Sequence, residues 1–207
     1  DGDFDLRVTT TTDTLEYDDL NNATQFRTLA PNVAGTIATG TQTFLRVNHF
    51  TANPVPPVSP PLPTPQALEP YRLYSAVQPP IGAATGEVEP NNTIGQANSA
   101  GNNYFSGSFS VTTDLDVFAF NGQAGRLVFV SLDCDPLRNN TPVNGALELL
   151  DSTGAVLWSV NDFTQTSSTT ASPGTLVGFT PFSPAEGLVY NITATATYYV
   201  RVSLTGP

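Results

Sequence analysis

The sequence predicts an all-β protein built from packed antiparallel sheets. Short segments of alternating apolar and polar residues recur about every ten residues, with Gly, Asn, Ser and Pro between them. Residues that favour strands and turns dominate the composition, including 18 prolines, and no segment has a convincing helical period. Many short strands with regularly spaced turn signals are typical of a β-sandwich.

The first expected element is a hairpin near the N-terminus. Phe4, Leu6 and Val8 alternate with polar residues, and Leu15 and Tyr17 do so again after a run of threonines. This alternation places one side chain in two on the same face of a sheet. The pattern therefore predicts two strands joined by a Thr-rich connection.

Further strands are expected along the rest of the chain. Two of them, Phe44–Val47 and Tyr71–Val77, flank residues 51–70, whose eight prolines predict a polyproline-like surface loop. Residues 163–185 are expected to form a second long loop. The remaining strands are expected at 104–111, 116–121, 126–133, 145–151, 155–161, 186–191 and 197–204. Turns are expected at Asn121-Gly122, Asn144-Gly145 and Ser152-Thr153-Gly154.

Two parts of the chain repeat one another. Phe4 aligns with Leu147 and Tyr17 with Val160, both at an offset of 143, and Phe44–Val47 aligns with Tyr199–Val202 at an offset of 155. Self-similarity of this kind predicts tandem units of one architecture. We expect a partial sandwich over 1–80 that includes the Pro-rich loop 51–70, a linker over 81–86, and a more complete sandwich over 87–207.

Acidic and amide side chains cluster at the start of the second unit. Glu87-Val88-Glu89-Pro90-Asn91-Asn92 precedes one predicted strand, and Asp114-Leu115-Asp116 precedes the next. Calcium prefers six to eight oxygen ligands of this chemical type. The alternative is a turn whose acidic side chains are simply solvated.

Five motifs, in order, resemble the bacterial pre-peptidase C-terminal domain over about residues 86–204. They are Glu-Pro-Asn-Asn at 89–92, Asp-x-Asp at 114–116, a Gly-containing turn at 122–125, Leu-x-Leu-x-Asp-x-x-Gly at 147–154 and Tyr-Tyr-Val-Arg-Val at 198–202. The resemblance implies a calcium-binding, jelly-roll-like β-sandwich attached to exported proteins. With the repeat, it predicts tandem jelly-roll-like antiparallel β-sandwiches, the second near-complete and the first partial. The ligands that it implies are Glu87, Glu89, Asn91, Asn92, Asp114 and Asp116.

Composition excludes several classes of function. The formal net charge is -11 and all seven basic residues are Arg, which argues against binding nucleic acid or anionic membranes. No apolar run approaches the roughly 18 residues needed to insert across a bilayer. The chain begins at Asp1 without Met, so we expect a mature or trimmed product that is extracellular or at the cell surface.

No catalytic constellation is recognisable. His49 is the single histidine, no Gly-x-Ser-x-Gly elbow occurs, and His49 with Cys134 cannot complete a zinc site. The carboxylate pairs Asp18/Asp19 and Asp133/Asp135 are expected to be solvated or to bind cations rather than to cleave glycosides. We therefore expect no enzyme.

Several single residues carry weaker expectations. Cys134 is expected to be a buried free thiol, with an intermolecular bridge as the alternative. Adjacent Tyr198 and Tyr199 must face opposite sides of a strand, so they are the candidates for an outward, ligand-facing aromatic. Asn91 lies in a sequon but is favoured as a calcium ligand. The remaining glycosylation candidates are Asn22, Asn139 and Asn191.

The two units are incomplete in complementary ways. Nothing in the first unit corresponds to residues 87–120, and nothing in the second corresponds to Tyr71–Val77. Unpaired sheet edges are templates for strands of another chain. The sequence therefore predicts a non-enzymatic structural building block that joins copies of itself head to tail, in a filament or surface array. The alternatives are a piece of a longer tandem array, and an accessory module of a secreted hydrolase that binds matrix or polysaccharide.

Overall fold

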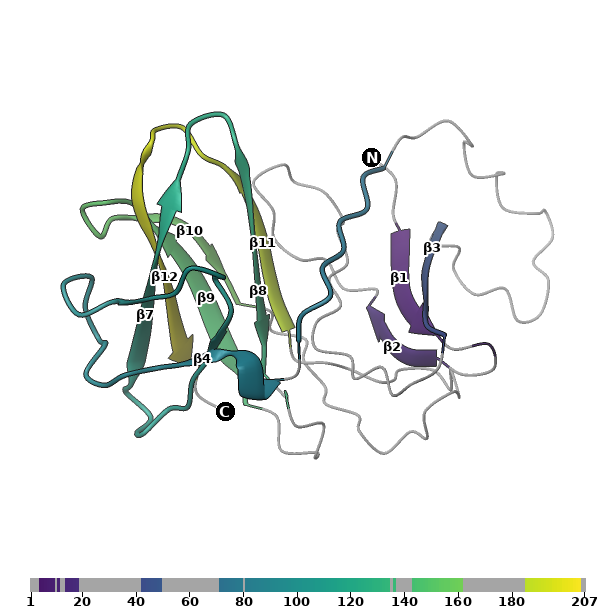
Figure 1. Cartoon of the computed structure of the whole chain (residues 1–207), viewed down its shortest axis with the longest axis horizontal. Coiled ribbons are helices and arrows are strands. Elements are labelled where there is room, and N and C mark those ends of the chain that lie inside the picture. Colours follow the sequence, from purple (N-terminus) through teal and green to yellow (C-terminus); the bar gives the residue numbers. More distant parts are fainter. Residues whose placement is uncertain are drawn as a thin grey trace.

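A computed structural model describes residues 4–9, 11, 14–18, 42–49, 71–79, 81–134, 136, 143–161 and 185–205. Within these ranges the protein is all-β, as predicted, and its helical content is a single 3-10 turn, η1. Figure 1 shows one group of strands formed by β1–β3 and another formed by β4–β12, with residues 71–79 running between them. The elements are β1 (Phe4–Thr9), β2 (Thr14–Asp18), β3 (Phe44–His49), η1 (Ile81–Ala83), β4 (Thr85–Gly86), β5 (Asn98–Ser99), β6 (Phe105–Ser106), β7 (Leu115–Gly122), β8 (Leu127–Asp133), β9 (Gly145–Leu150), β10 (Val156–Val160), β11 (Ala185–Asn191) and β12 (Ala196–Leu204).

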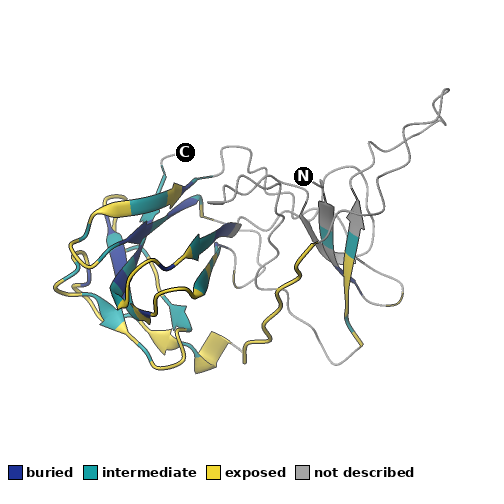
Figure 2. Cartoon of the chain, turned by 90° about the horizontal axis from the view of Figure 1, so that it is seen from above, coloured by how far each residue is buried: buried dark blue, intermediate teal, exposed yellow. Residues whose placement is uncertain are grey.

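The second group of strands packs as a β-sandwich. A five-stranded sheet with the order β10-β9-β12-β7-β5 supplies Leu147, Leu149 and Val200 to the core, and the two-stranded sheet β11-β8 supplies Leu188 from the other side. Leu147 and Leu149 have no exposed surface. In Figure 2 the buried residues gather in these strands, whereas residues 71–79 are exposed along their whole length. Burial of apolar side chains between the two sheets is the main force that holds them together.

Strand β12 lies at the centre of the larger sheet. It pairs antiparallel with β9 on one side and with β7 on the other. Tyr198, Val200 and Val202 point into the core, and the Tyr198 hydroxyl donates a hydrogen bond of 2.9 Å to the Ala194 carbonyl. On the opposite face the Arg201 Nε donates to Glu148 Oε2 across the β12–β9 pair at 2.6 Å.

The strand order of the first group repeats that of the second. The three-stranded sheet β2-β1-β3 corresponds to β10-β9-β12, as the sequence repeat predicts, and all the pairs are antiparallel. Leu6 faces Val47 in one sheet, whereas Leu149 faces Val200 in the other. Since the alignment pairs Val47 with Val202, the two registers differ by two residues. A shift of two leaves every side chain on the same face of its sheet.

Two predicted strands are wrong in whole or in part. Residues 71–79, which include the expected strand Tyr71–Val77, are extended but form no strand pairing. The expected strand at 104–111 is reduced to β6, because Gly107 and Ser108 turn toward Glu87 instead of continuing a ladder. The other predicted strands agree with β1–β3 and β7–β12 to within about three residues. The Pro-rich loop 51–70 and residues 163–184 lie outside the described residues.

One of the three predicted turns is displaced and another is wrong. Asn121-Gly122 ends β7, and the turn follows it, where the Arg126 amide donates to the Gln123 carbonyl and Gly125 has a φ of 79°. Gly145 begins β9 instead of forming a turn. Close packing explains both glycines: a Cβ on Gly122 would lie 2.5 Å from the Tyr198 ring, and one on Gly145 would lie 2.8 Å from Cys134 Sγ. The turn at Ser152-Thr153-Gly154 is confirmed, and its glycine has a φ of 87°.

The predicted linker is partly structured. Residues 81–83 form η1, and β4 pairs in parallel with β6, with Thr85 opposite Phe105. The second half of the linker therefore belongs to the sandwich. Cys134 is buried and free, and burial raises the pKa of its thiol to about 12. Across the ranges that the structure describes, no helix is long and apolar enough to cross a membrane.

We expect the core of the second group to dominate its stability. Leu149→Ala should lower the free energy of unfolding by about 2–5 kcal/mol, because it leaves a cavity where no surface is exposed. Val156→Ala, at a position that is 48% exposed, is the matched control and should cost less than about 1 kcal/mol. Urea denaturation measures both, and equal losses would contradict this assignment of the core.

Candidate metal centre

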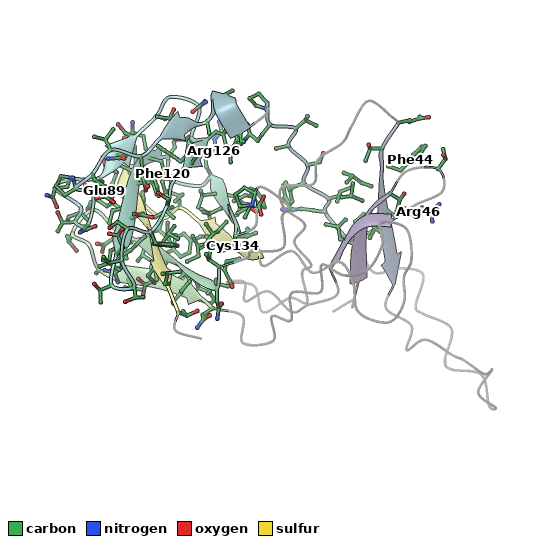
Figure 3. The ribbon with its side chains drawn as sticks, turned by 90° about the horizontal axis from the view of Figure 1, so that it is seen from below. Phe44, Arg46, Glu89, Phe120, Arg126 and Cys134 are labelled. Carbon is green, nitrogen blue, oxygen red and sulfur yellow. The ribbon has the colours of Figure 1, made fainter. Side chains whose placement is uncertain are left out.

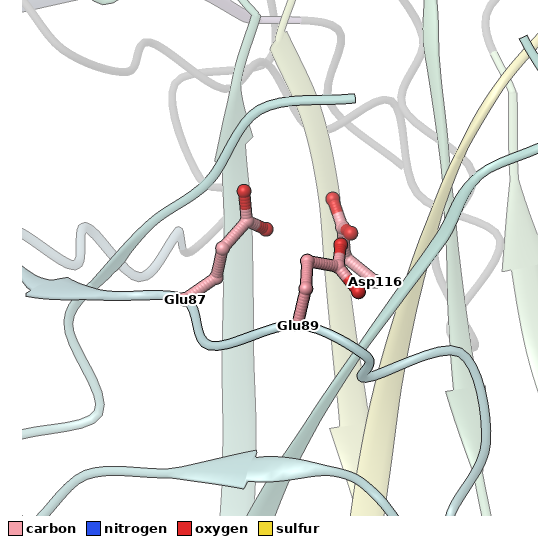
Figure 4. Close-up of side chains that lie close together, drawn as sticks. All are labelled: Glu87, Glu89 and Asp116. Carbon is pink, nitrogen blue, oxygen red and sulfur yellow. The ribbon is translucent and has the colours of Figure 1, made fainter. Parts of the chain in front are cut away.

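Three carboxylates converge at one end of the sandwich. Glu87, Glu89 and Asp116 each offer an oxygen, and these oxygens all lie within 4.8 Å of one another. Glu87 and Glu89 leave the same segment after β4, and Asp116 is the second residue of β7 (Figure 4). Figure 3 shows that Glu89 lies at the end of the sandwich remote from Phe44 and Arg46 of β3.

Glu87 is held in place by the chain after β6. Its amide donates to the Ser106 carbonyl at 2.9 Å, and its Oε1 accepts from the Ser108 amide at 2.5 Å and from the Ser108 hydroxyl at 3.2 Å. Gly107 makes this approach possible, because a Cβ there would lie 2.6 Å from Glu87 Oε2. Glu87 Oε1 is therefore occupied, and Oε2 faces the cluster with Asp116.

Hydrogen bonds also fix the segment that carries Glu89. Asn98 Oδ1 accepts from the Val88 amide at 2.6 Å, and Asn98 Nδ2 donates to the Val88 carbonyl at 3.1 Å. Glu89 Oε2 accepts from the Asn91 amide at 2.9 Å. The Asn91 carbonyl in turn accepts from the Val117 amide at 3.1 Å, which ties the segment to β7 next to Asp116.

Buried polar atoms of this region lack partners. Asn91 has no exposed surface, yet neither its Oδ1 nor its Nδ2 makes a hydrogen bond. Asp116 is 3% exposed, and its Oδ1 is also without a partner, as is Glu87 Oε2. A buried polar group left unpaired costs about 1–3 kcal/mol, and a charged one costs more. Oxygen atoms in this state fit a hard cation such as calcium, which would satisfy them together.

The electrostatics of the cluster favour a cation as well. Burial, and then the negative charges of Glu87, Asp114 and Glu89, raise the pKa of Asp116 to about 7. The carboxylates therefore repel one another when all are ionised. A divalent cation reverses this balance, because it attracts every ionised member of the cluster.

Two of the six predicted ligands make other contacts. Asp114 Oδ2 accepts from the Ser110 amide at 2.6 Å and from its hydroxyl at 2.7 Å, and these bonds lower the pKa of Asp114. Asn92, with its amide oriented to suit its neighbours, donates to Asp114 Oδ1 at 3.1 Å and to the Leu115 carbonyl at 2.6 Å. Asp114 and Asn92 thus stabilise the turn that leads into β7. The carboxylates of Glu87, Glu89 and Asp116 converge. Asn91 is buried and lies two positions after Glu89 in the sequence.

Sequence reasoning missed three residues that build the centre, namely Asn98, Gly107 and Ser108. The available signal was a glycine between two serines and two phenylalanines at 105–109, which is unusual for a regular strand. That signal indicated either a break in the strand or a close approach of another group to the glycine. The structure shows the second, the approach of the Glu87 side chain to Gly107. Nothing in the sequence indicated that Asn98 would bind the backbone ten residues before it.

The other predicted site residues have different outcomes. Tyr198 is 3% exposed, so its assignment as a ligand-facing residue is wrong: it points into the core, as the alternation of β12 requires. Tyr199 is half-buried on the other face. Asn191 is exposed at the end of β11, whereas Asn22 and Asn139 lie outside the described residues. The side chain of His49 is likewise not described.

Comparisons with known protein families, with curated proteins and with solved structures found no match to this chain. The resemblance to the pre-peptidase C-terminal domain therefore stays a prediction that rests on the motifs of this sequence.

We expect calcium to stabilise the protein through this centre. At a free concentration of about 100 times the dissociation constant, one site adds about 2.7 kcal/mol to the free energy of unfolding. Glu87→Gln, Glu89→Gln and Asp116→Asn should each reduce this gain, because each removes a carboxylate of the cluster. Glu148→Gln is the control: it breaks the ion pair with Arg201 but should keep the full response to calcium. An unchanged response in all three cluster variants would exclude the site.

The metal-free protein should lose stability as pH rises. The pKa of Asp116 is about 7 in the folded protein and 3.8 in the reference state, so folding opposes its ionisation from about pH 4 to about pH 7. Asp116→Asn removes this penalty. In the presence of a chelator, the variant should gain stability relative to wild type across that interval and show a constant difference above it. Urea denaturation at pH 4.5 and 7.5 tests this, and an equal difference at both would contradict it.

Proposed function

We propose that this protein is a non-enzymatic extracellular structural protein, built from tandem jelly-roll-like β-sandwiches, which assembles head to tail by β-strand complementation. The observation that carries the proposal is the unequal completeness of two sheets with the same strand order. In the second group, β12 pairs with β9 and also with β7. Its counterpart β3 pairs only with β1 among the described strands.

Among the described strands, the side of β3 away from β1 has no partner strand and fits the role of an acceptor edge. Phe44 and Leu45 point to opposite faces of the sheet and are 38% and 44% exposed, so neither face is fully covered at this end of β3. In the complete sheet, the equivalent edge of β12 forms pairs with β7 from Ala196↔Gly122 to Ser203↔Leu115. A strand edge without a partner is a template for a strand from another chain. Because donor and acceptor surfaces differ, the contact is heterologous and generates an open filament or array rather than a closed dimer.

The metal centre supports this role in a second way. Calcium bound by Glu87, Glu89 and Asp116 would attach the segment after the linker to β7 of the sandwich. The direction in which the chain enters the second group would then be fixed by metal ligands as well as by the β4–β6 pair. A building block gains from such a rigid connection, because bending at the linker would otherwise disorder the array.

Electron microscopy of the purified native protein tests the proposal. We expect filaments or ordered arrays in calcium at high protein concentration, and shorter or less regular ones after a chelator is added. Glu87→Gln in excess calcium should resemble the chelated wild type, and Glu148→Gln should resemble the untreated protein. Dispersed monomers at every concentration, confirmed by sedimentation, would overturn the building-block role and favour the accessory binding module.

A further inference from the structure

The segment that connects the two groups of strands is exposed along its whole length. Residues 71–79 contain no strand or helix, and each of them is exposed. Leu73 is 44% exposed and Val77 is 99% exposed. Figures 1 and 2 show the segment as one extended trace between the two groups. Exposed connections of this kind are the places where proteases preferentially cut a folded chain.

One residue of this segment has the chemistry that selects a class of protease. Arg72 is exposed, and it is the single charged residue among residues 71–79. A guanidinium pairs with a carboxylate through two parallel hydrogen bonds. A carboxylate at the base of the specificity pocket is what makes trypsin-like serine proteases prefer a basic residue before the bond that they cut. Arg72 therefore fits an endoprotease of this class.

The other described arginines lie in hydrogen-bonded structure. Arg7 and Arg46 are paired in register between β1 and β3. Arg201 lies in the central strand β12, which pairs on both of its sides. The Arg126 carbonyl accepts a hydrogen bond of 2.8 Å from the Ile192 amide. A protease can reach the bonds after these residues only when the surrounding structure opens, and that opening costs free energy.

The composition limits the number of competing bonds. The chain contains no lysine, so its basic side chains other than His49 are seven arginines. A protease that requires a basic residue therefore has few candidate bonds along 207 residues. Two of the seven, Arg27 and Arg138, lie outside the described residues, and the cleavage experiment has to resolve cuts after them as well.

Contacts on both sides of Arg72 hold the segment in place. Tyr71 takes part in an interaction within the chain, and the Tyr74 ring lies against Phe129 of β8 with the ring centroids 3.9 Å apart. A cut between Arg72 and Leu73 leaves Tyr74 on the fragment that contains β8. The contact with Phe129 therefore survives the cut.

We propose that the peptide bond between Arg72 and Leu73 is a processing site at which a trypsin-like endoprotease separates the two groups of strands. Hydrolysis consumes one water: the bond between the Arg72 carbonyl carbon and the Leu73 nitrogen breaks. The carbonyl carbon gains the water oxygen and becomes a carboxylate, and the nitrogen takes up the protons and becomes an ammonium group. The products are residues 1–72, which contain β1–β3, and residues 73–207, which contain β4–β12.

Such a cut goes beyond the proposed function and would control it. In the proposed assembly, the acceptor edge of β3 and the carboxylate cluster of the second group belong to one covalent chain. Hydrolysis of one bond would separate them, so a protease could release the second group from an array. The inference does not rest on assembly, because the cut can be measured on dispersed chains.

Limited proteolysis of the folded full chain tests the inference, with intact mass spectrometry to identify each cut. We expect trypsin to cut after Arg72 at least about tenfold faster than after the other described arginines, because those bonds are reached only after local opening. Arg72→Gln should abolish this early cut. Arg46→Gln is the matched control and should keep it. Thermal unfolding checks that both variants are folded.

The outcomes separate this inference from the proposed function. An Arg72 bond that stays intact while the bond after any other arginine is cut would overturn the inference. Equally early cleavage of the segment by chymotrypsin would overturn it too, because the connection would then show no preference for arginine. Early cleavage after Arg72 in a protein that stays monomeric at every concentration would support the inference and contradict the building-block role.

Discussion

The pairing of β12 with strands on both of its sides is the interaction on which the rest of the sandwich depends. Through β9 and β10 it places Leu147, Leu149 and Val160 in the core, and through β7 it fixes the strand that carries Asp116. Leu188 and Ile192 of the smaller sheet and its following loop pack onto the surface so formed. Removing β12 would divide the five-stranded sheet into two separate pieces, β10-β9 and β7-β5.

The candidate metal centre is a consequence of that pairing. Asp116 is buried because its neighbours in β7 belong to the core, and Val117 is only 1% exposed. The burial of one carboxylate beside Glu87 and Glu89 creates an electrostatic cost that the protein chain alone does not offset. We propose that the same arrangement also offers a cation a place to bind. Stability and metal binding would then be linked through the side chain of Asp116.

Much of the fold could be predicted from alternation, because most strands from β7 to β12 carry apolar residues at alternate positions, as Val128, Val130 and Leu132 do in β8. Glycine was harder to interpret. Gly122 and Gly145 follow asparagine as turn glycines often do, yet they are glycines because Tyr198 and Cys134 leave no space for a Cβ. Such a contact joins residues far apart in sequence, so no local pattern reveals it. The prediction of a strand at Tyr71–Val77 was wrong for a different reason. Its residues favour a strand, but this preference does not supply a partner strand.

The candidate site could also be predicted only in part. The sequence predicted which acidic segments lie close together, since Glu87, Glu89 and Asp116 were all expected in one centre. It could not rank them against Asp114 and Asn92, which have the same chemistry. Hydrogen bonds distinguish these carboxylates: the Ser110 amide donates to Asp114 Oδ2, whereas Asp116 Oδ1 accepts no hydrogen bond. Which carboxylate is satisfied within the protein depends on the exact path of a turn, and that path is a property of the folded chain.

Cys134 has a consequence for how any array of this protein would behave as a material. Its thiol lies against Gly145, the residue is 4% exposed, and the raised pKa keeps the thiol protonated at neutral pH, all of which disfavour oxidation while the chain stays folded. The chain also contains no lysine, which excludes amide cross-links between side chains of neighbouring subunits. Cohesion between copies would therefore depend on backbone pairing, side-chain packing and bound ions. Such an array could be taken apart and rebuilt without breaking a covalent bond.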